Sequence, residues 1–183
     1  MAMPAALPQF TVDDLYRLPD DGNRYELLHG MLLVTPQAGI THQTIAARLA
    51  GSLIATLQGE PGIQLWSPGV IEVRPGIHLE PDILVGRMPK VARWAAVREH
   101  WLAVEVSGTG SRVYDRDYKR DGYLAVGVAE VWLVDLSLEQ VFVSRASGEK
   151  DVPHAGELSW RSPAGRELQV DIAALFRNVP KEE

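Results

Sequence analysis

The chain contains no cysteine among its 183 residues. Disulfide bonds and metal sites built from thiolates are therefore both excluded. It also has no apolar run approaching the roughly 18 to 20 residues that cross a bilayer, so we expect no membrane segment. The N-terminal stretch MAMPAALPQF lacks the positive start and the sustained apolar run of a secretory signal. These absences predict a cytoplasmic protein.

Several motifs of nucleotide binding and hydrolysis are absent as well. The sequence has no GxxxxGK(S/T) phosphate loop, no GxGxxG fingerprint, no HExxH zinc motif and no GxSxG nucleophile elbow. The glycine-rich stretch Gly108–Ser111 is not followed by a lysine at phosphate-loop spacing. The five histidines are scattered, so a zinc site of His, Asp and Glu stays open but gains no support from ligand spacing.

Net positive charge is also missing, since the formal net charge is -6 and the pI is near 5.4. Proteins that coat nucleic acid usually carry the opposite sign, because their affinity comes largely from neutralising phosphates. The cations are unevenly distributed, however. Eight of the 18 Lys and Arg residues fall in one segment: Arg87, Lys90, Arg93, Arg98, Arg112, Arg116, Lys119 and Arg120. This segment is either a local basic surface or a set of ordinary solvated helix faces.

Hydrophobic patterning predicts a single α/β domain over residues 1–183. With 46% hydrophobic and 23% charged residues, the chain can form one full core. Capping residues and apolar spacings of three and four predict four helices. The first begins at Thr11, and the other three cover Thr41–Leu57, Asp115–Val126 and Asp171–Phe176.

Strand patterns occupy much of the remaining sequence. They cover Arg24–Leu28, Met31–Thr35, Ile63–Trp66, Val70–Val73, Ile83–Val85, Trp101–Val106, Val128–Val134 and Gln140–Ser144. Between the first two, His29 and Gly30 indicate a tight hairpin. Trp101–Val106 and Val128–Val134 are almost continuously apolar, as is typical of central strands buried on both faces. The order of elements predicts a mixed sheet with helices packed against it, an α+β arrangement within the α/β class.

Three acidic residues lie within or against apolar strand patterns: Glu26, Asp82 and Glu105. Burying an unpaired carboxylate is costly, so each of them needs a partner. One such acid would usually be structural. Three of them favour a shared site, because a single bound cation can serve several carboxylates together.

An ordered set of motifs surrounds these acids. It consists of Arg24-Tyr25-Glu26-Leu27 with Gly30, Pro81-Asp82, Val104-Glu105-Val106, Asp115 with Lys119 and Tyr123, and the stretch Gly127–Asp135 with its Glu-x-Trp-x-x-Asp pattern. The set resembles the Uma family of restriction-endonuclease-like proteins, a branch of the PD-(D/E)XK nuclease superfamily. The resemblance spans roughly Thr11 to Arg145, most of the chain.

The resemblance implies a restriction-endonuclease-like core, over about residues 11–145, in which a mixed sheet is flanked by helices. In such sites an Asp and a Glu, here Asp82 and Glu105, hold Mg²⁺, for which Mn²⁺ can substitute. The backbone carbonyl after the Glu, here that of Val106, adds a ligand. Mg²⁺ suits oxygen ligands, polarises a phosphodiester and lowers the pKa of a bound water.

One position departs from the superfamily pattern. The lysine that normally stands two residues after the Glu is replaced by Ser107. Some branches supply this lysine from the following helix, where Lys119 is the matching residue, and its charge would stabilise a reacting phosphate. The alternative for Lys119 is a surface ion pair with Asp115 at i,i+4 spacing. Glu26 either completes the metal shell or forms an ion pair with Arg24 or Lys119.

Three other polar residues are interpreted as structural. His42 precedes the long predicted helix and reads as a cap or a packing contact. Glu130 and Asp135 flank Trp132 and read as framework for helix or subunit contacts.

The leading hypothesis from the sequence is a Mg²⁺-dependent endonuclease that hydrolyses DNA, with Asp82, Glu105, Lys119 and Glu26 as its catalytic set. One alternative is a catalytically inactive nuclease-fold module for binding or assembly, favoured by the acidic balance and by Ser107. Another is a hydrolase of other phosphate esters, which would use the same metal site. Because nuclease folds often pair to cut two strands, a homodimer or higher homo-oligomer is also expected.

Overall fold

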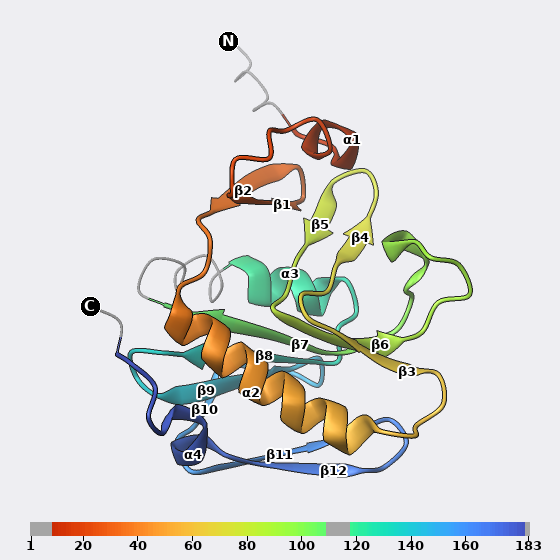
Figure 1. Ribbon diagram of the computed structural model, residues 1–183. Helices are drawn as coiled ribbons and strands as arrows, with labels where there is room; N and C mark the ends of the chain where they lie inside the picture. Colours follow the sequence, from red (N-terminus) through yellow and green to blue (C-terminus); the bar gives the residue numbers. More distant parts are fainter. Residues whose placement is uncertain (1–8, 109–117, 182–183) are drawn as a thin grey trace.

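A computed structural model describes residues 9–108 and 118–181 of the chain (Figure 1). The helices are α1 (Val12–Leu15), α2 (Ile40–Leu57), α3 (Arg120–Ala125) and α4 (Ile172–Phe176), with a short 3₁₀ helix η1 (Trp94–Ala96). The strands are β1 (Arg24–Leu28), β2 (Met31–Thr35), β3 (Ile63–Trp66), β4 (Ile71–Val73), β5 (Ile77–Leu79), β6 (Ile83–Arg87), β7 (His100–Ser107), β8 (Glu130–Asp135), β9 (Gln140–Arg145), β10 (Val152–His154), β11 (Glu157–Arg161) and β12 (Glu167–Asp171).

A six-stranded sheet in the order β10-β9-β8-β7-β6-β3 forms the centre of the molecule. Its central pair, β7 and β8, is parallel, and the pairs on either side are antiparallel. A second, four-stranded sheet has the order β2-β1-β5-β4, and β11 pairs with β12 in a separate hairpin. This mixed sheet with flanking helices confirms the predicted fold class, including the central position of the two most apolar strands.

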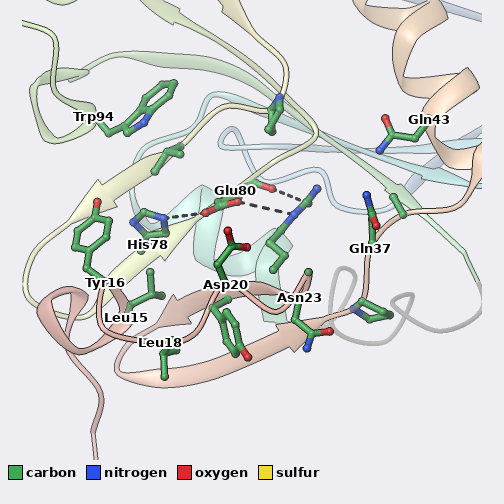
Figure 2. A pocket seen from close by; sticks show the side chains of 17 residues that line it. Leu15, Tyr16, Leu18, Asp20, Asn23, Gln37, Gln43, His78, Glu80 and Trp94 are labelled. Atoms are coloured by element: carbon green, nitrogen blue, oxygen red, sulfur yellow. Dashed lines mark hydrogen bonds and ion pairs between the residues drawn. The ribbon is translucent and has the colours of Figure 1, made fainter.

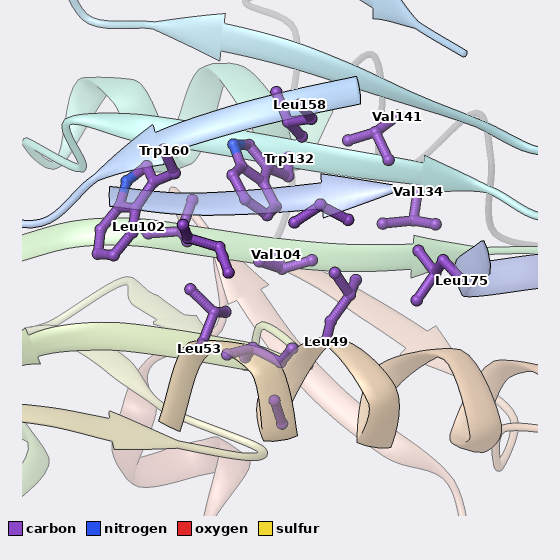
Figure 3. Close-up of a cluster of buried hydrophobic side chains, with 14 of the residues drawn as sticks. Leu49, Leu53, Leu102, Val104, Trp132, Val134, Val141, Leu158, Trp160 and Leu175 are labelled. Carbon is purple, nitrogen blue, oxygen red and sulfur yellow. The ribbon is translucent and has the colours of Figure 1, made fainter. Parts of the chain in front are cut away.

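The central sheet separates two hydrophobic clusters. Helix α2, helix α4 and the β11–β12 hairpin cover one face, where Leu49 and Leu53 meet Val104 and Trp132 (Figures 1 and 3). The other face carries α3 and the four-stranded sheet, whose side chains pack against residues such as Ala103. Val104 and Ala103 belong to different clusters because successive side chains of a strand point to opposite faces.

The first three predicted elements form as the sequence indicates. Thr11 and Asp14 make a reciprocal capping box at the start of α1, with the Thr11 N–H donating to Asp14 Oδ2 at 2.9 Å. His29 and Gly30 have φ angles of 51° and 79°, as a tight turn between β1 and β2 requires. These elements confirm the predicted helix start and hairpin.

Helix α2 also follows its predicted range, with Ile45, Leu49, Leu53 and Leu57 buried along one face. Helix α3 lies within the helix predicted over Asp115–Val126. Asp115 itself, together with Arg112 and Arg116, lies outside the described residues.

Four strands were not predicted: β5, β10, β11 and β12. Leu158 and Trp160 of β11 and Leu168 and Val170 of β12 belong to the first cluster, so the core includes side chains beyond Arg145. Among the described residues, no helix is both long and apolar enough to span a membrane.

Candidate active site

Strand pairing between β6 and β7 brings Asp82 and Glu105 together. Ile83 lies opposite Val104 in this antiparallel pair, which places the preceding Asp82 opposite the following Glu105. Directly opposed residues share a face of the sheet, with Cβ atoms about 4.5–5.5 Å apart. The hydrogen bond from the Val106 N–H to Asp82 Oδ2 holds the Asp82 carboxylate beside β7, next to Glu105.

Asp82 is held by three neighbours from different elements. Its Oδ1 lies 3.3 Å from Arg24 Nη1, and its Oδ2 lies 2.9 Å from His42 Nε2. The Val106 N–H donates to the same Oδ2 at 2.8 Å. Burial disfavours the charged carboxylate, but the contacts with His42, Arg24 and the Val106 N–H outweigh burial and lower the pKa of Asp82. Asp82 is thus a buried carboxylate that the fold keeps ionised.

Lys119 lies between the other two predicted acids. Its Nζ is 2.5 Å from Glu26 Oε2 and 3.4 Å from Glu105 Oε1. The side chains of Lys119, Glu26 and Glu105 are 2%, 0% and 3% exposed, so this is an internal ion-pair cluster. The Tyr123 hydroxyl donates a hydrogen bond to Glu105 Oε1 as well. Lys119 is therefore not on a helix surface, which contradicts the surface part of its alternative interpretation.

Glu26 forms the predicted ion pair with Lys119. The Glu80 N–H also donates to Glu26 Oε1 at 2.7 Å, which fixes the carboxylate from the neighbouring strand. Burial raises the pKa of Glu26, although the charge of Lys119 acts in the opposite direction. Burial is thus the largest influence on the Glu26 carboxyl, and it disfavours the charged form.

Arg24 connects the buried acids to an open pocket. Burial by itself would lower the pKa of Arg24, but the surrounding carboxylates of Asp82, Glu105, Glu26 and Glu80 raise it, so the guanidinium stays charged. Arg24 Nη1 also donates to the Glu80 backbone carbonyl at 3.1 Å. The guanidinium thus lies near four carboxylates.

The pocket next to Arg24 has a volume of about 660 Å³. Arg24 and Glu80 line it, and Figure 2 shows Trp94 on one side of the pocket with Gln37 and Gln43 on another. His78 Nε2 lies 3.0 Å from Glu80 Oε1 in its wall. Arg24 lines this pocket and also contacts Asp82, whereas Asp82 itself is buried and does not line the pocket.

The site offers oxygen ligands of the type that Mg²⁺ prefers, but only a few of them. Within residues 9–108 and 118–181, no three His, Asp or Glu side chains form a group that could hold a metal ion. Mg²⁺ does not require such a group, because it commonly binds one or two carboxylates and completes its octahedron with waters and substrate phosphates. Asp82 and Glu105 supply two carboxylates of this kind from neighbouring strands.

His42 is the contact that sequence reasoning missed. It was interpreted as a cap or packing residue, but the cap of α2 is Gly39, and His42 Nε2 contacts Asp82 instead. About forty positions separate the two residues in the sequence, so no local pattern could have connected them.

The residues expected to be framework lie in the β8–β9 hairpin. Glu130 accepts hydrogen bonds from Trp132 Nε1 at 2.6 Å and from Arg145 Nε at 2.8 Å. Asp135 accepts from the backbone N–H groups of Ser137 and Leu138, which begin the turn.

Comparisons with known proteins agree with this architecture. The crystal structure of "a putative nuclease belonging to DUF820" from Anabaena variabilis ATCC 29413 has a TM-score of 0.71 and 18% identity to this chain. The alignment covers 91% of this chain and 97% of that one, and at this identity it shows a shared fold. No curated protein matches the chain. The family described as "Uma2: Putative restriction endonuclease" matches residues 12–173, and the chain therefore belongs to that family.

Proposed function

We propose that this protein is an endonuclease that hydrolyses DNA phosphodiester bonds with the help of a divalent cation, Mg²⁺ in the cell. The observation that carries the proposal is the β6–β7 pairing, which brings Asp82 next to Glu105, while Glu105 shares Lys119 with Glu26. Membership of a restriction-endonuclease family supports the same class of activity.

In this proposal Asp82 and Glu105 hold the cation, together with the backbone carbonyl of Val106. When bound, Mg²⁺ polarises the phosphodiester and makes a water more acidic. Both oxygens of Asp82 already have protein contacts, with Arg24 on one and with His42 and the Val106 N–H on the other. Binding therefore competes with Arg24 or His42 for a carboxylate oxygen.

Lys119 supplies a fixed positive charge beside Glu105. Its Nζ is held by Glu26 at 2.5 Å, so Glu26 acts as a positioning residue for the ammonium group. A charge fixed in advance in a buried site stabilises negative charge that develops on a phosphate more strongly than the same charge in water. This is the role that the superfamily assigns to a lysine at the position of Ser107.

A binding module without catalysis is the second candidate. The contacts that already hold both oxygens of Asp82 favour it, since they satisfy this buried acid without a metal. The two candidates differ in whether the carboxylates hold a cation and in whether DNA is cut.

Nicking of supercoiled plasmid in Mg²⁺ or Mn²⁺ tests the proposal. We expect the wild-type protein to nick the plasmid and the Asp82→Asn and Glu105→Gln variants to lose the activity. Glu130→Gln is the matched control, because Glu130 is a strand carboxylate of the same sheet that contacts Trp132 and Arg145 instead.

A folded wild-type protein that cuts nothing in either metal would contradict the enzyme and favour the binding module. Hydrolysis of bis(p-nitrophenyl) phosphate without plasmid nicking would instead indicate that other phosphate esters are the substrates.

A further inference from the structure

A second pocket, of about 550 Å³, lies beside the one that leads to Arg24. Its wall is formed mainly by the segment between β6 and β7 and by Trp66 at the end of β3. Met88 and Val91 in this wall are 51% and 56% exposed, so apolar surface faces solvent here. Large exposed apolar side chains gathered around a pocket indicate a binding site rather than ordinary surface.

Two indole rings give this pocket flat surfaces. The rings of Trp66 and Trp94 meet edge to face, with centroids 5.6 Å apart and an interplanar angle of 73°. Both side chains are partly exposed, so aromatic surface borders the pocket. Trp66 packs closely on Gly86, where an added Cβ would lie 3.4 Å from Cζ3, and it also contacts the second hydrophobic cluster. The floor of the pocket is therefore anchored to the sheet.

Two cations complete the pocket wall. Lys90 and Arg93 both line the pocket and are exposed, and in the described part of the chain neither forms an ion pair with an acid. Arg87, by contrast, pairs with Glu99 at 2.6 Å and stacks over Trp101. On a protein with a net charge of -6, cations beside aromatic rings match a ligand that is both planar and anionic.

Trp94 joins this pocket to the one that Arg24 and Glu80 line. It lines both pockets, and in Figure 2 its ring stands at the edge of the pocket that contains Glu80. Arg24 lines the same pocket as Trp94, so a strand bound in that pocket has both side chains in its wall. The two pockets are therefore neighbours that share the Trp94 side chain.

We propose that the pocket formed by Trp66, Trp94, Lys90 and Arg93 binds an unpaired base of the nucleic-acid substrate, with the two cations on the flanking phosphates. The inference rests on the proposed nuclease function and names the form of substrate that this function would use. Stacking on aromatic rings holds bases of any sequence, because every base has a flat π-face.

Fluorescence anisotropy with a fluorescein-labelled oligothymidylate, in EDTA to prevent cleavage, tests the inference. We expect Trp94→Ala to weaken binding about 5- to 150-fold, the range for loss of one base–aromatic stack, and Trp94→Phe to retain most of the affinity. Lys90→Ala/Arg93→Ala should reduce the slope of log affinity against log salt by about 1.4, because each single-strand phosphate contact contributes about 0.7.

The matched control is Arg161→Ala/Lys181→Ala, which removes the same charge from two residues outside both pockets. Arg161 and Lys181 are 69% and 88% exposed, and they pair with Glu167 and Glu139 respectively. We expect this control to leave the salt slope unchanged within error. A duplex of the same length should compete with the labelled strand less well than unlabelled oligothymidylate does.

Three results would overturn the inference. The first is that the folded wild-type protein does not bind the strand, and the second is that Trp94→Ala binds it with unchanged affinity. The third is a different oligomeric state in Trp94→Ala, which would make the pocket a contact between copies of the chain. The plasmid assay separates this inference from the nuclease proposal. If strand binding depends on Trp94 but the protein never nicks plasmid, the nuclease proposal is wrong and the binding pocket stands. If the protein nicks plasmid but strand binding does not depend on Trp94, only the binding pocket is wrong.

Discussion

Replacing Lys119 with Met tests the buried ion-pair cluster without any assumption about catalysis. The substitution keeps most of the length of the side chain and removes only its charge. In the wild-type protein this charge lies 2.5 Å from Glu26 and 3.4 Å from Glu105, and the three side chains are at most 3% exposed. The variant therefore leaves two carboxylates in the interior without their shared cation.

Removing one partner of a buried ion pair typically lowers the free energy of unfolding by about 3–5 kcal/mol. For a chain of this size, each kcal/mol corresponds to about 2–4 °C, so the melting temperature should fall by about 6–20 °C. Lys150→Met is the matched control. Lys150 is half-exposed and pairs with Asp121 at 2.9 Å, and an exposed pair of this kind contributes about 1 kcal/mol or less.

The loss should depend on pH in a defined direction. Burial already raises the pKa of Glu26, and loss of Lys119 raises it further. A carboxylate whose pKa is higher in the folded state than in the unfolded state binds more protons when folded, so its presence lowers stability as pH rises. The difference between Lys119→Met and wild type should therefore be largest near neutral pH and shrink in acid, through the range between the unfolded and folded pKa values of Glu26.

Urea unfolding at several pH values, with and without Mg²⁺, measures these effects. The double variant Glu26→Gln/Lys119→Met should lose less stability than the sum of the two single losses, and the difference, the coupling energy, should be about 1–3 kcal/mol. A Lys119→Met variant as stable as the Lys150→Met control at pH 7 would refute the buried cluster. So would an equal loss of stability at acidic and neutral pH.

Two other predictions concern the metal and the sheet. Mg²⁺ should raise the melting temperature of the wild-type protein, because an ion at one hundred times its Kd adds about 2.7 kcal/mol to the free energy of unfolding. Asp82→Asn should lose most of this shift in melting temperature. A wild-type protein whose melting temperature does not change in millimolar Mg²⁺ would count against metal binding. Gly86→Ala should destabilise the fold by about 1–3 kcal/mol in thermal melts, because the added Cβ would lie 2.6 Å from the Glu99 backbone carbonyl oxygen, whereas Gly51→Ala, with open space around the same position, should not.

The predictable part of the fold is the part whose signal is local. A capping box at Thr11, a two-residue turn at His29-Gly30 and the apolar face of α2 are all written within a few positions of one another. Strand β5 has only three residues, Ile77–Leu79, and β10 contains Pro153. Such short segments form because a neighbouring strand pairs with them, and that neighbour is distant in the sequence.

The same distinction applies to the candidate site. Asp82 and Glu105 stood out because an acid within an apolar strand conflicts with the local pattern. Arg24 and His42 carried no such conflict, since a cation at a strand end or near a helix start is ordinary. Their positions around Asp82 depend on how β1 and α2 pack against β6, and this packing is a property of the whole fold.

The arrangement around Asp82 also bears on how the proposed metal binding would relate to folding. In a structural metal site, the protein often needs the ion to fold, because the ligands repel one another without it. Here Lys119 lies between Glu26 and Glu105, while Arg24 and the Val106 N–H stabilise the charge on Asp82. The fold thus carries its own cations for its buried acids. A divalent ion would replace some of these contacts in a protein that is already folded, which suits a site that takes up its ion together with a substrate phosphate.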